Sequence, residues 1–250
     1  MQVAVRTDVG PVRDVNEDSY CAFDLAPLWP GRLFAVADGM GGYEGGEVAS
    51  SLAIMALNDH LRTALEVWKQ AGQGPDPDFE DMLAGAFAAA DAAIQAEANK
   101  RPGIKGMGTT LTAVVAGEGR IWLAHVGDCR AYLLLDGALR QITDDHSLVG
   151  ELVKNGSLTE EEAMAHPQRN IVTNALTADA ATHVDLSQFE YRPGDDLLIC
   201  SDGLTGTVSS KDIAAVLMAQ DLDGAAEALV QMATERGGTD NVTVLLVRLS

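Results

Sequence analysis

Acidic side chains stand where predicted strands end or in the tight turns beside them. They occur in five segments, Asn16-Glu17-Asp18, Ala37-Asp38-Gly39, Val126-Gly127-Asp128, Ser201-Asp202-Gly203 and Thr239-Asp240-Asn241. Because strands from distant parts of a chain can end at one place in a fold, these carboxylates could converge. Gathered carboxylates repel one another, and bound cations relieve the repulsion by favouring their ionised forms. Hard oxygen ligands suit magnesium or manganese.

Each of these segments also has a simpler interpretation. Asp and Gly are the commonest turn formers, so one Asp-Gly pair is most economically explained as a turn. Five such sites could all be turns, and composition alone does not separate a solvated acidic surface from a cation site. The choice between turns and a cation site therefore depends on the elements that position the carboxylates and on the motifs around them.

The charge balance excludes some partners. The 250 residues include 37 Asp and Glu against 17 Lys and Arg, which gives a formal net charge of -20. Such a chain repels a phosphate backbone, so nucleic acid and anionic membranes are poor partners. With 47% apolar residues, the chain is long and apolar enough to bury a large core.

The cysteines indicate a reducing environment. Cys21, Cys129 and Cys200 are odd in number and lack metal-type spacing, so neither a disulfide framework nor a zinc cluster is expected. The first residues lack the pattern of a secretion signal, and no apolar run approaches the length that spans a membrane. We therefore expect a cytoplasmic protein.

The first part of the chain is expected to form two strands before a glycine-rich loop. Val3 and Val5 share one face of an extended segment, and residues 32–37 form a β-prone run that ends at Asp38. The glycines of residues 39–46 predict a tight loop between strand and helix.

Two helices are expected next, separated by a Gly- and Pro-containing linker over residues 70–77. The first has one apolar face formed by Leu57, Leu61, Ala64, Leu65 and Trp68. The second runs to about residue 100, and its apolar face comprises Phe79, Met82, Leu83, Ala86, Phe87, Ala90 and Ile94. This second face is expected to cover a sheet.

The middle of the chain predicts strands. Four short strands separated by turns read as an antiparallel meander over residues 109–116, 120–126, 131–135 and 138–143. Residues 145–177 are expected to be irregular with short helices, and Thr159 with Glu162 forms a capping box for one of them. A surface flap at about 145–178 is therefore predicted.

The last part predicts two strands, two helices and a closing strand, over residues 183–191, 196–201, 210–218, 223–235 and 241–249. Residues 192–195 form the turn between the first two strands. Strands grouped in the middle, with paired helices after the first and last groups, favour an α+β domain over a βαβ alternation. We expect a single domain over residues 1–250.

The chain resembles the metal-dependent type 2C protein phosphatases over essentially its whole length. The ordered signature of that family is matched by Arg13-Asp14-Val15-Asn16-Glu17-Asp18, Asp38-Gly39-Met40-Gly41-Gly42, Val126-Gly127-Asp128-Cys129-Arg130, Ser201-Asp202-Gly203 and Asp240-Asn241. The flap of the bacterial members is matched by Asp145-His146-Ser147, Leu152, Gly156, Thr159, Glu162, His166-Pro167 and Arg169-Asn170. The joint order of these segments is far more specific than any one of them.

The resemblance implies a fold and a metal centre. The family's fold is a central β-sandwich of two mainly antiparallel sheets flanked by helices on both faces, a four-layer αββα arrangement. Two Mn²⁺ or Mg²⁺ ions are implied, with Asp38 bridging them and the Gly39 carbonyl helping to hold one. Asp202 and Asp240 are implied as ligands of the other ion, and Glu17 as a ligand directly or through water. The implied nucleophile is hydroxide rather than a side chain.

Further roles follow from the same resemblance. Arg13 matches the phosphate-binding arginine, although a salt bridge to Glu17 or Asp18 is its simpler interpretation. Asp18 and Asn241 are implied as residues behind the ligands, with Asp18 orienting Arg13 or metal-bound waters. Asp128 matches a residue that helps to bind a third ion near the flap, although a hairpin Asp is an equally good interpretation.

Two positions depart from the family pattern as it stands in animal members. Met40 occupies the place of a histidine proposed there to protonate the leaving group, whereas bacterial members commonly carry Met. Cys129 stands where serine is usual, and we expect it to be a small buried residue. His146 and His166 are interpreted as capping or packing residues of the flap rather than catalysts.

The function implied is hydrolysis of phosphoserine and phosphothreonine on partner proteins, opposing a bacterial Ser/Thr kinase or acting on its targets. The alternatives are a catalytically inactive phosphoprotein-binding module on the same fold, which is expected to lack a bridging or terminal carboxylate, and a hydrolase of small phosphate esters.

Overall fold

The computed structural model describes residues 1–41, 45–72, 76–177 and 182–250. The elements, in chain order, are β1 (Gln2–Asp8), β2 (Asp18–Asp24), β3 (Arg32–Met40), α1 (Gly45–Ala71), α2 (Phe79–Lys100), the 3₁₀ turn η1 (Pro102–Ile104), β4 (Gly108–Thr109), β5 (Leu111–Gly117), β6 (Arg120–Val126), β7 (Arg130–Leu135), β8 (Ala138–Gln141), α3 (Leu148–Lys154), α4 (Glu160–Met164), β9 (Leu176–Thr177), β10 (Asp185–Glu190), β11 (Asp196–Cys200), α5 (Asp202–Thr205), α6 (Ser210–Ala219), α7 (Leu222–Glu235) and β12 (Val242–Arg248).

The strands form two antiparallel sheets. One has five strands in the order β1-β12-β11-β7-β8, and the other has seven, in the order β10-β6-β5-β3-β4-β9 with β2 paired to β3. The inner faces of both sheets carry alternate apolar residues of β3, β5, β6, β7, β11 and β12, and these pack into one buried layer. The predicted sandwich of two antiparallel sheets is confirmed.

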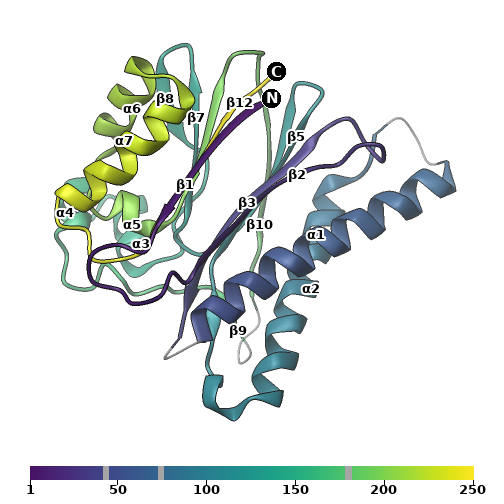
Figure 1. The fold of residues 1–250 in the computed structure, drawn as a ribbon, viewed down its shortest axis with the longest axis horizontal. Helices are drawn as coiled ribbons and strands as arrows, with labels where there is room; N and C mark the ends of the chain where they lie inside the picture. Colours follow the sequence, from purple (N-terminus) through teal and green to yellow (C-terminus); the bar gives the residue numbers. More distant parts are fainter. Residues whose placement is uncertain (42–44, 73–75, 178–181) are drawn as a thin grey trace.

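Helices cover both outer faces. Figure 1 shows α1 and α2 lying over the seven-stranded sheet and α6 and α7 over the five-stranded sheet on the opposite side. Each pair buries its apolar stripe against its sheet, so the molecule has two further hydrophobic layers outside the sandwich core. The predicted four-layer αββα arrangement of an α+β fold is confirmed.

The helical periodicity predicted these contacts well. In α2, Phe79, Leu83 and Phe87 are fully buried against the sheet, and Met82 is partly buried beside them. In α1, the leucines Leu57, Leu61 and Leu65 are fully buried, while Ala64 and Trp68 flank them at the half-buried edge. A repeat of three or four residues brings one face inward, which is what these patterns require. The two helices near the C-terminus also begin and end within a residue of the predicted limits.

The predicted glycine loop is wrong in part. Gly45 and Gly46 begin α1 rather than lie in a loop. Only glycine fits at this contact between helix and strand. A side chain at Gly46 would collide with the Glu17 carboxylate, and a side chain at Gly39 would collide with the Gly46 backbone. Glycine here allows helix and strand to approach closely. Gly42 and part of the predicted linker lie outside the described residues.

Strand β2 was not predicted. Its sequence alternates weakly, and only Cys21 is fully buried, because β2 pairs with β3 alone at the edge of the sheet. Strand β3 also continues beyond the predicted end at Asp38 as far as Met40. The missing strand matters because it begins at Asp18 and therefore sets the position of that carboxylate.

The predicted meander is wrong in part, because its four strands are present but belong to two sheets. Strands β5 and β6 pair in the seven-stranded sheet, whereas β7 and β8 pair in the five-stranded sheet. The chain crosses between the sheets at residues 127–129, where Gly127 has a φ of 110° that favours glycine. Both faces of β5 and β6 are buried, so periodicity does not show which sheet the strands after them join. Asp128 thus lies at a crossover, not in a hairpin.

The predicted flap segment contains α3, α4 and β9, and its end at residue 178 lies outside the described residues. The capping box is confirmed, with the Thr159 side chain accepting from the Glu162 backbone and Glu162 accepting from the Thr159 backbone. The short helix α5 was not predicted. Among the described residues, no helix is both long and apolar enough to cross a membrane.

Candidate metal centre

Two carboxylates face each other across neighbouring strands. Asp18 on β2 and Asp38 on β3 are directly opposite in the antiparallel register. Like charges in this position destabilise a sheet. Burial, together with the nearby carboxylates, raises the pKa of Asp18 to about 7. The pKa of Asp38 is raised well above its ordinary value by burial and then by repulsion from Asp18, Asp202 and other carboxylates. This part of the fold therefore concentrates negative charge.

The backbone around Asp38 is fixed by hydrogen bonds. Thr110 donates its backbone N–H to the Asp38 carbonyl at 2.9 Å, and its hydroxyl accepts from the Asp38 N–H at 3.0 Å. Thr109 donates its hydroxyl to the same carbonyl at 2.8 Å. The Gly39 N–H donates to the Glu17 carbonyl at 3.1 Å. The carboxylate of Asp38 and the carbonyl of Gly39 thus start from a rigid segment.

Three more of the predicted carboxylates line one cavity. Asp128, Asp202 and Asp240 all border it, and the flap residue Glu160 lies on its wall. Asp202 stands at the start of α5, directly after β11. Burial and the nearby Asp240 raise the pKa of Asp202. The structure therefore brings these residues from three separated segments to one place.

Orphaned oxygen atoms show that these residues fit a cation. Within the described ranges, one carboxylate oxygen of each of Glu17, Asp18 and Asp202 is buried and accepts no hydrogen bond. An unsatisfied buried carboxylate oxygen is costly, and a divalent cation is the group that satisfies several at once. The donor set consists of hard oxygen atoms, as Mg²⁺ and Mn²⁺ prefer.

The carboxylates do not form a complete metal cage by themselves. Among the described residues, no group of three or more His, Cys, Asp or Glu side chains that could hold a metal ion is found. Mg²⁺ usually keeps several water ligands and uses few carboxylates. An open set of carboxylates beside a cavity is therefore consistent with this chemistry.

Asp18 is held from the opposite sheet. Its Oδ2 accepts from the Ser201 hydroxyl at 2.8 Å and from the Thr243 hydroxyl at 2.7 Å. Ser201 directly follows β11 and Thr243 lies on β12, whereas Asp18 lies on β2. The hydrogen bonds therefore join the two sheets. No sequence pattern indicates Thr243, and only the Ser-Asp-Gly motif points to Ser201.

Arg13 lies at the edge of the carboxylate cluster. Its Nη2 is 2.8 Å from Asp240 Oδ2, and its Nη1 is 3.7 Å from Glu17 Oε2. The hydrogen bond to Asp240 is the main reason that the pKa of Arg13 is raised. The side chain remains 46% exposed, so the guanidinium both contacts the cluster and faces solvent. The alternative salt bridge to Glu17 is thus present, but as the longer of two contacts.

Asn241 closes the loop that carries Arg13. Its side-chain N–H₂ donates to the Val9 carbonyl at 2.8 Å and to the Val15 carbonyl at 3.0 Å. Its side-chain oxygen accepts from the Glu17 N–H at 2.8 Å. Asn241 is buried, and one amide therefore fastens both ends of the Arg13 loop beside the carboxylates. This role was not evident from the Asp-Asn motif.

The Asn241→Asp variant is expected to loosen this loop. The carboxylate keeps an acceptor for Glu17 but loses the donors to Val9 and Val15, and it adds a charge beside Asp240. We expect the free energy of unfolding to fall by ~1–3 kcal/mol, since an unsatisfied buried group costs about this much. Denaturant unfolding will measure this. An Asn241→Asp variant as stable as the unmodified protein contradicts the role.

Asp128 borders the same cavity as Asp202, Asp240 and residues of the flap. Burial and repulsion from Asp202 and Asp145 raise its pKa well above the ordinary value. Arg130 binds Asp145 through two nitrogens, with distances of 2.7 to 2.9 Å, and this pair fixes the start of the flap next to Asp128. Sequence reasoning missed the pair, although both residues lie in the motifs that were noted.

The remaining residues of interest have structural contacts. Cys129 is fully buried and its sulfur is 3.1 Å from the Thr110 hydroxyl, as expected of a small buried residue. His146 accepts from the Gly127 N–H at 3.1 Å and lies 3.1 Å from Asp185, so it holds the base of the flap. His166 accepts from the Gln168 N–H at 3.2 Å.

The order and geometry of these segments match a known family. The model of the family described as protein phosphatase 2C matches residues 14–244. The chain belongs to the protein phosphatase 2C family. This match confirms the resemblance noted from the ordered motifs.

Curated relatives support the same conclusion. The serine/threonine protein phosphatase PstP of Mycobacterium tuberculosis is 42% identical over 246 residues, which cover 98% of this chain but 44% of that protein. The chain thus spans less than half the length of this relative. The serine/threonine phosphatase stp of Listeria monocytogenes is 37% identical over 249 residues, covering 99% of this chain and 95% of that protein.

A solved structure shows the fold with metal bound. The catalytic domain of the serine/threonine protein phosphatase PstP in complex with two manganese ions is 39% identical, with a TM-score of 0.81, and the match covers 98% of this chain and 96% of that chain. A relative with the same fold therefore binds two manganese ions.

Proposed function

We propose that this phosphatase 2C chain is a metal-dependent protein serine/threonine phosphatase. The observation that carries the proposal is the convergence of buried, unsatisfied carboxylate oxygens of Glu17, Asp18 and Asp202 next to Arg13. The cluster needs cations, and the arginine offers a site for the phosphate that such cations would act upon. The names of the relatives point to the same reaction.

The proposed metal-holding residues are those that the motifs predicted. Asp38, Asp202 and Asp240, with Glu17 and the Gly39 carbonyl, would hold two Mn²⁺ or Mg²⁺ ions. When bound, such ions would supply an activated water and would offset the charge that develops on the phosphate oxygens. Asp128, beside the flap, is proposed to help hold a third.

The chain's own residues then orient the substrate. Arg13 is always charged and presents a planar fork that can bind two phosphate oxygens. Its pairing with Asp240 fixes the guanidinium at the edge of the cluster. The hydroxyls of Ser201 and Thr243 hold one oxygen of Asp18 and leave its other oxygen directed into the carboxylate cluster. Met40 has no titratable group, so protonation of the leaving group passes to water or to another group.

The deciding experiment compares two substrates. A phosphothreonine peptide and p-nitrophenyl phosphate are each incubated with EDTA, magnesium or manganese. We expect phosphate release from both with manganese and none with EDTA. Release from p-nitrophenyl phosphate alone would favour a hydrolase of small esters. Metal binding without turnover of either substrate would favour the inactive binding module, which the complete carboxylate set argues against.

The Arg13→Ala variant is expected to weaken phosphate binding. Removing a bidentate charged contact costs ~1.5–3 kcal/mol, so kcat/KM for the phosphothreonine peptide is expected to fall about 10- to 100-fold. Arg13→Lys, which keeps the charge but not the fork, is expected to recover only part of the loss. Unchanged kcat and KM in Arg13→Ala would remove Arg13 from this role.

The physiological setting is proposed from chemistry alone. The substrates are phosphorylated proteins, and a Ser/Thr kinase is the enzyme class that must form them. The strongly acidic chain disfavours nucleic acid and anionic membranes as partners. The cytoplasmic location inferred from the cysteines stays a prediction.

A further inference from the structure

The loop that carries Arg13 has exposed valines before and after Arg13 in the chain. Val12 is 64% exposed, Val15 41% and Val9 36%. Among the described residues nine large hydrophobic side chains are exposed, and three of them fall within residues 9–15, called here the valine loop. Single exposed apolar residues are ordinary on a protein surface, but a local group of them marks an interaction site.

The valine loop is held rigidly. Asn241 binds the carbonyls of its first and last residues, Val9 and Val15. The Gly10 N–H donates to Asp8 Oδ1 at 2.7 Å, and Asn16 donates to the Thr7 hydroxyl at 2.8 Å just beyond the loop. The valines are therefore exposed in a fixed arrangement, so binding a partner there loses little conformational entropy.

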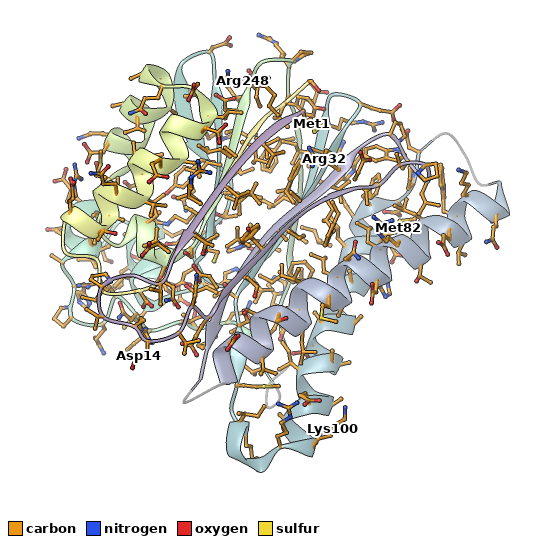
Figure 2. All side chains as sticks on the ribbon, viewed as in Figure 1. Met1, Asp14, Arg32, Met82, Lys100 and Arg248 are labelled. Carbon is orange, nitrogen blue, oxygen red and sulfur yellow. The ribbon has the colours of Figure 1, made fainter. Side chains whose placement is uncertain are left out.

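The position of the loop connects it to the phosphate site. Arg13 reaches from the loop to Asp240, which also lines the cavity under the flap. Figure 2 shows Asp14 at the outer tip of the loop, at the opposite end of the strands from Met1 and Arg248. Arg13 thus contacts a residue of the cavity wall and is flanked in the chain by the exposed side chains of Val12 and Val15.

We propose that Val12 and Val15 bind an apolar side chain that lies next to the phosphorylated residue of the substrate. This inference rests on the proposed function. An extended peptide advances ~3.3–3.6 Å per residue, so residues one or two places from a phosphothreonine held at Arg13 reach the flanking positions of the valine loop. The substrate class is therefore a phosphoprotein segment with an aliphatic or aromatic residue beside the phosphorylated one.

A second copy of the chain is a poorer occupant. A stable protein interface buries about 800 Å² on each partner, far more than three valine side chains supply. A peptide side chain needs only a small apolar surface, and its main affinity comes from the phosphate at Arg13. The continuity of the valine loop with Arg13 therefore favours the substrate.

The test uses two phosphothreonine peptides that differ only beside the phosphorylated residue, one with leucine there and one with serine, together with p-nitrophenyl phosphate. The variant is Val12→Ser, and the control is Val67→Ser on α1, where the side chain is 61% exposed, as Val12 is at 64%. The manganese-loaded protein is used throughout, and kcat/KM is measured for each substrate.

We expect the unmodified protein to prefer the leucine peptide. Val12→Ser is expected to lower kcat/KM for this peptide about fivefold, from loss of part of a buried valine contact, while the other two substrates are unaffected. Val67→Ser is expected to change nothing. No preference for leucine, an equal fall on all three substrates, or the same fall in Val67→Ser would overturn the inference. Absence of all turnover by the unmodified protein would instead overturn the proposed function, and this inference with it.

Discussion

Asp38→Asn is expected to lower manganese-dependent turnover by roughly a thousandfold or more. Asp38 carries the charge proposed to be shared by two cations, and its loss removes several kcal/mol of charge stabilisation from the transition state. Asparagine has nearly the same shape, so the backbone bonds to Thr109 and Thr110 are expected to persist. Hydrolysis of p-nitrophenyl phosphate at saturating manganese measures the effect.

The same variant is expected to stabilise the metal-free protein. Asp38 is surrounded by carboxylates that raise its pKa, and the neutral amide removes one partner from this repulsion. Melting curves without metal should therefore shift upward, whereas the stabilisation that manganese gives should shrink. Asp59→Asn, at an exposed position of α1, is the control. Near-normal turnover, or full stabilisation by manganese, would exclude Asp38 from the metal centre.

Metal-free protein is expected to lose stability as the pH rises from about 6.5 to about 8. The pKa of Asp18 is raised from an ordinary 3.8 to about 7, first by burial. A folded state that binds the proton more tightly than the unfolded state is stabilised by protonation. This stabilisation is complete below about pH 4 and is lost as the pH rises through 7. Asp38 and Asp128 act in the same direction.

One group opposes this trend in the lower part of the window. Burial lowers the pKa of His125 to about 4, so its contribution to stability grows as the pH rises from 4 through 6.5. By about pH 7.5 His125 is nearly neutral in both states and its contribution no longer changes. We expect the melting temperature without metal to fall by roughly 5–10 °C across the window.

Manganese should reverse this trend. The cation needs ionised carboxylates, and protons compete with it, so its stabilisation of the folded protein should grow with pH. Asp18→Asn should flatten the metal-free slope, because the neutral amide no longer titrates. A metal-free melting temperature that rises across the window would contradict the assigned pKa directions.

The sequence predicted local features better than connections between distant residues. The faces of α1 and α2 followed from a helical repeat, and the capping box at Thr159 followed from residues three apart. The edge strand β2 was missed because an edge strand needs few buried residues, so its alternation is weak. The crossover after β6 was missed because fully apolar strands look alike whichever sheet they join.

The carboxylate site shows the same contrast between local features and contacts of distant residues. Ordered motifs were sufficient to name Asp38, Asp128 and Asp202, and the structure brings them around one carboxylate cluster. The residues that hold the carboxylates in place were not predictable. Asp18, for example, accepts a hydrogen bond from Thr243, which lies 225 positions away in the chain. Nothing in the spacing of such residues specifies contact. The loop-closing role of Asn241 is hidden for the same reason.

The hydrogen bonds from Ser201 and Thr243 to Asp18 bridge the two sheets, and this has a consequence for the order of folding. Asp18 and Asp38 belong to one sheet, whereas Asp202 and Asn241 lie beside strands of the other. Neither sheet alone contains the centre, so it forms only when the sandwich closes. A small displacement of one sheet over the other is therefore expected to disrupt the centre while every strand is still paired.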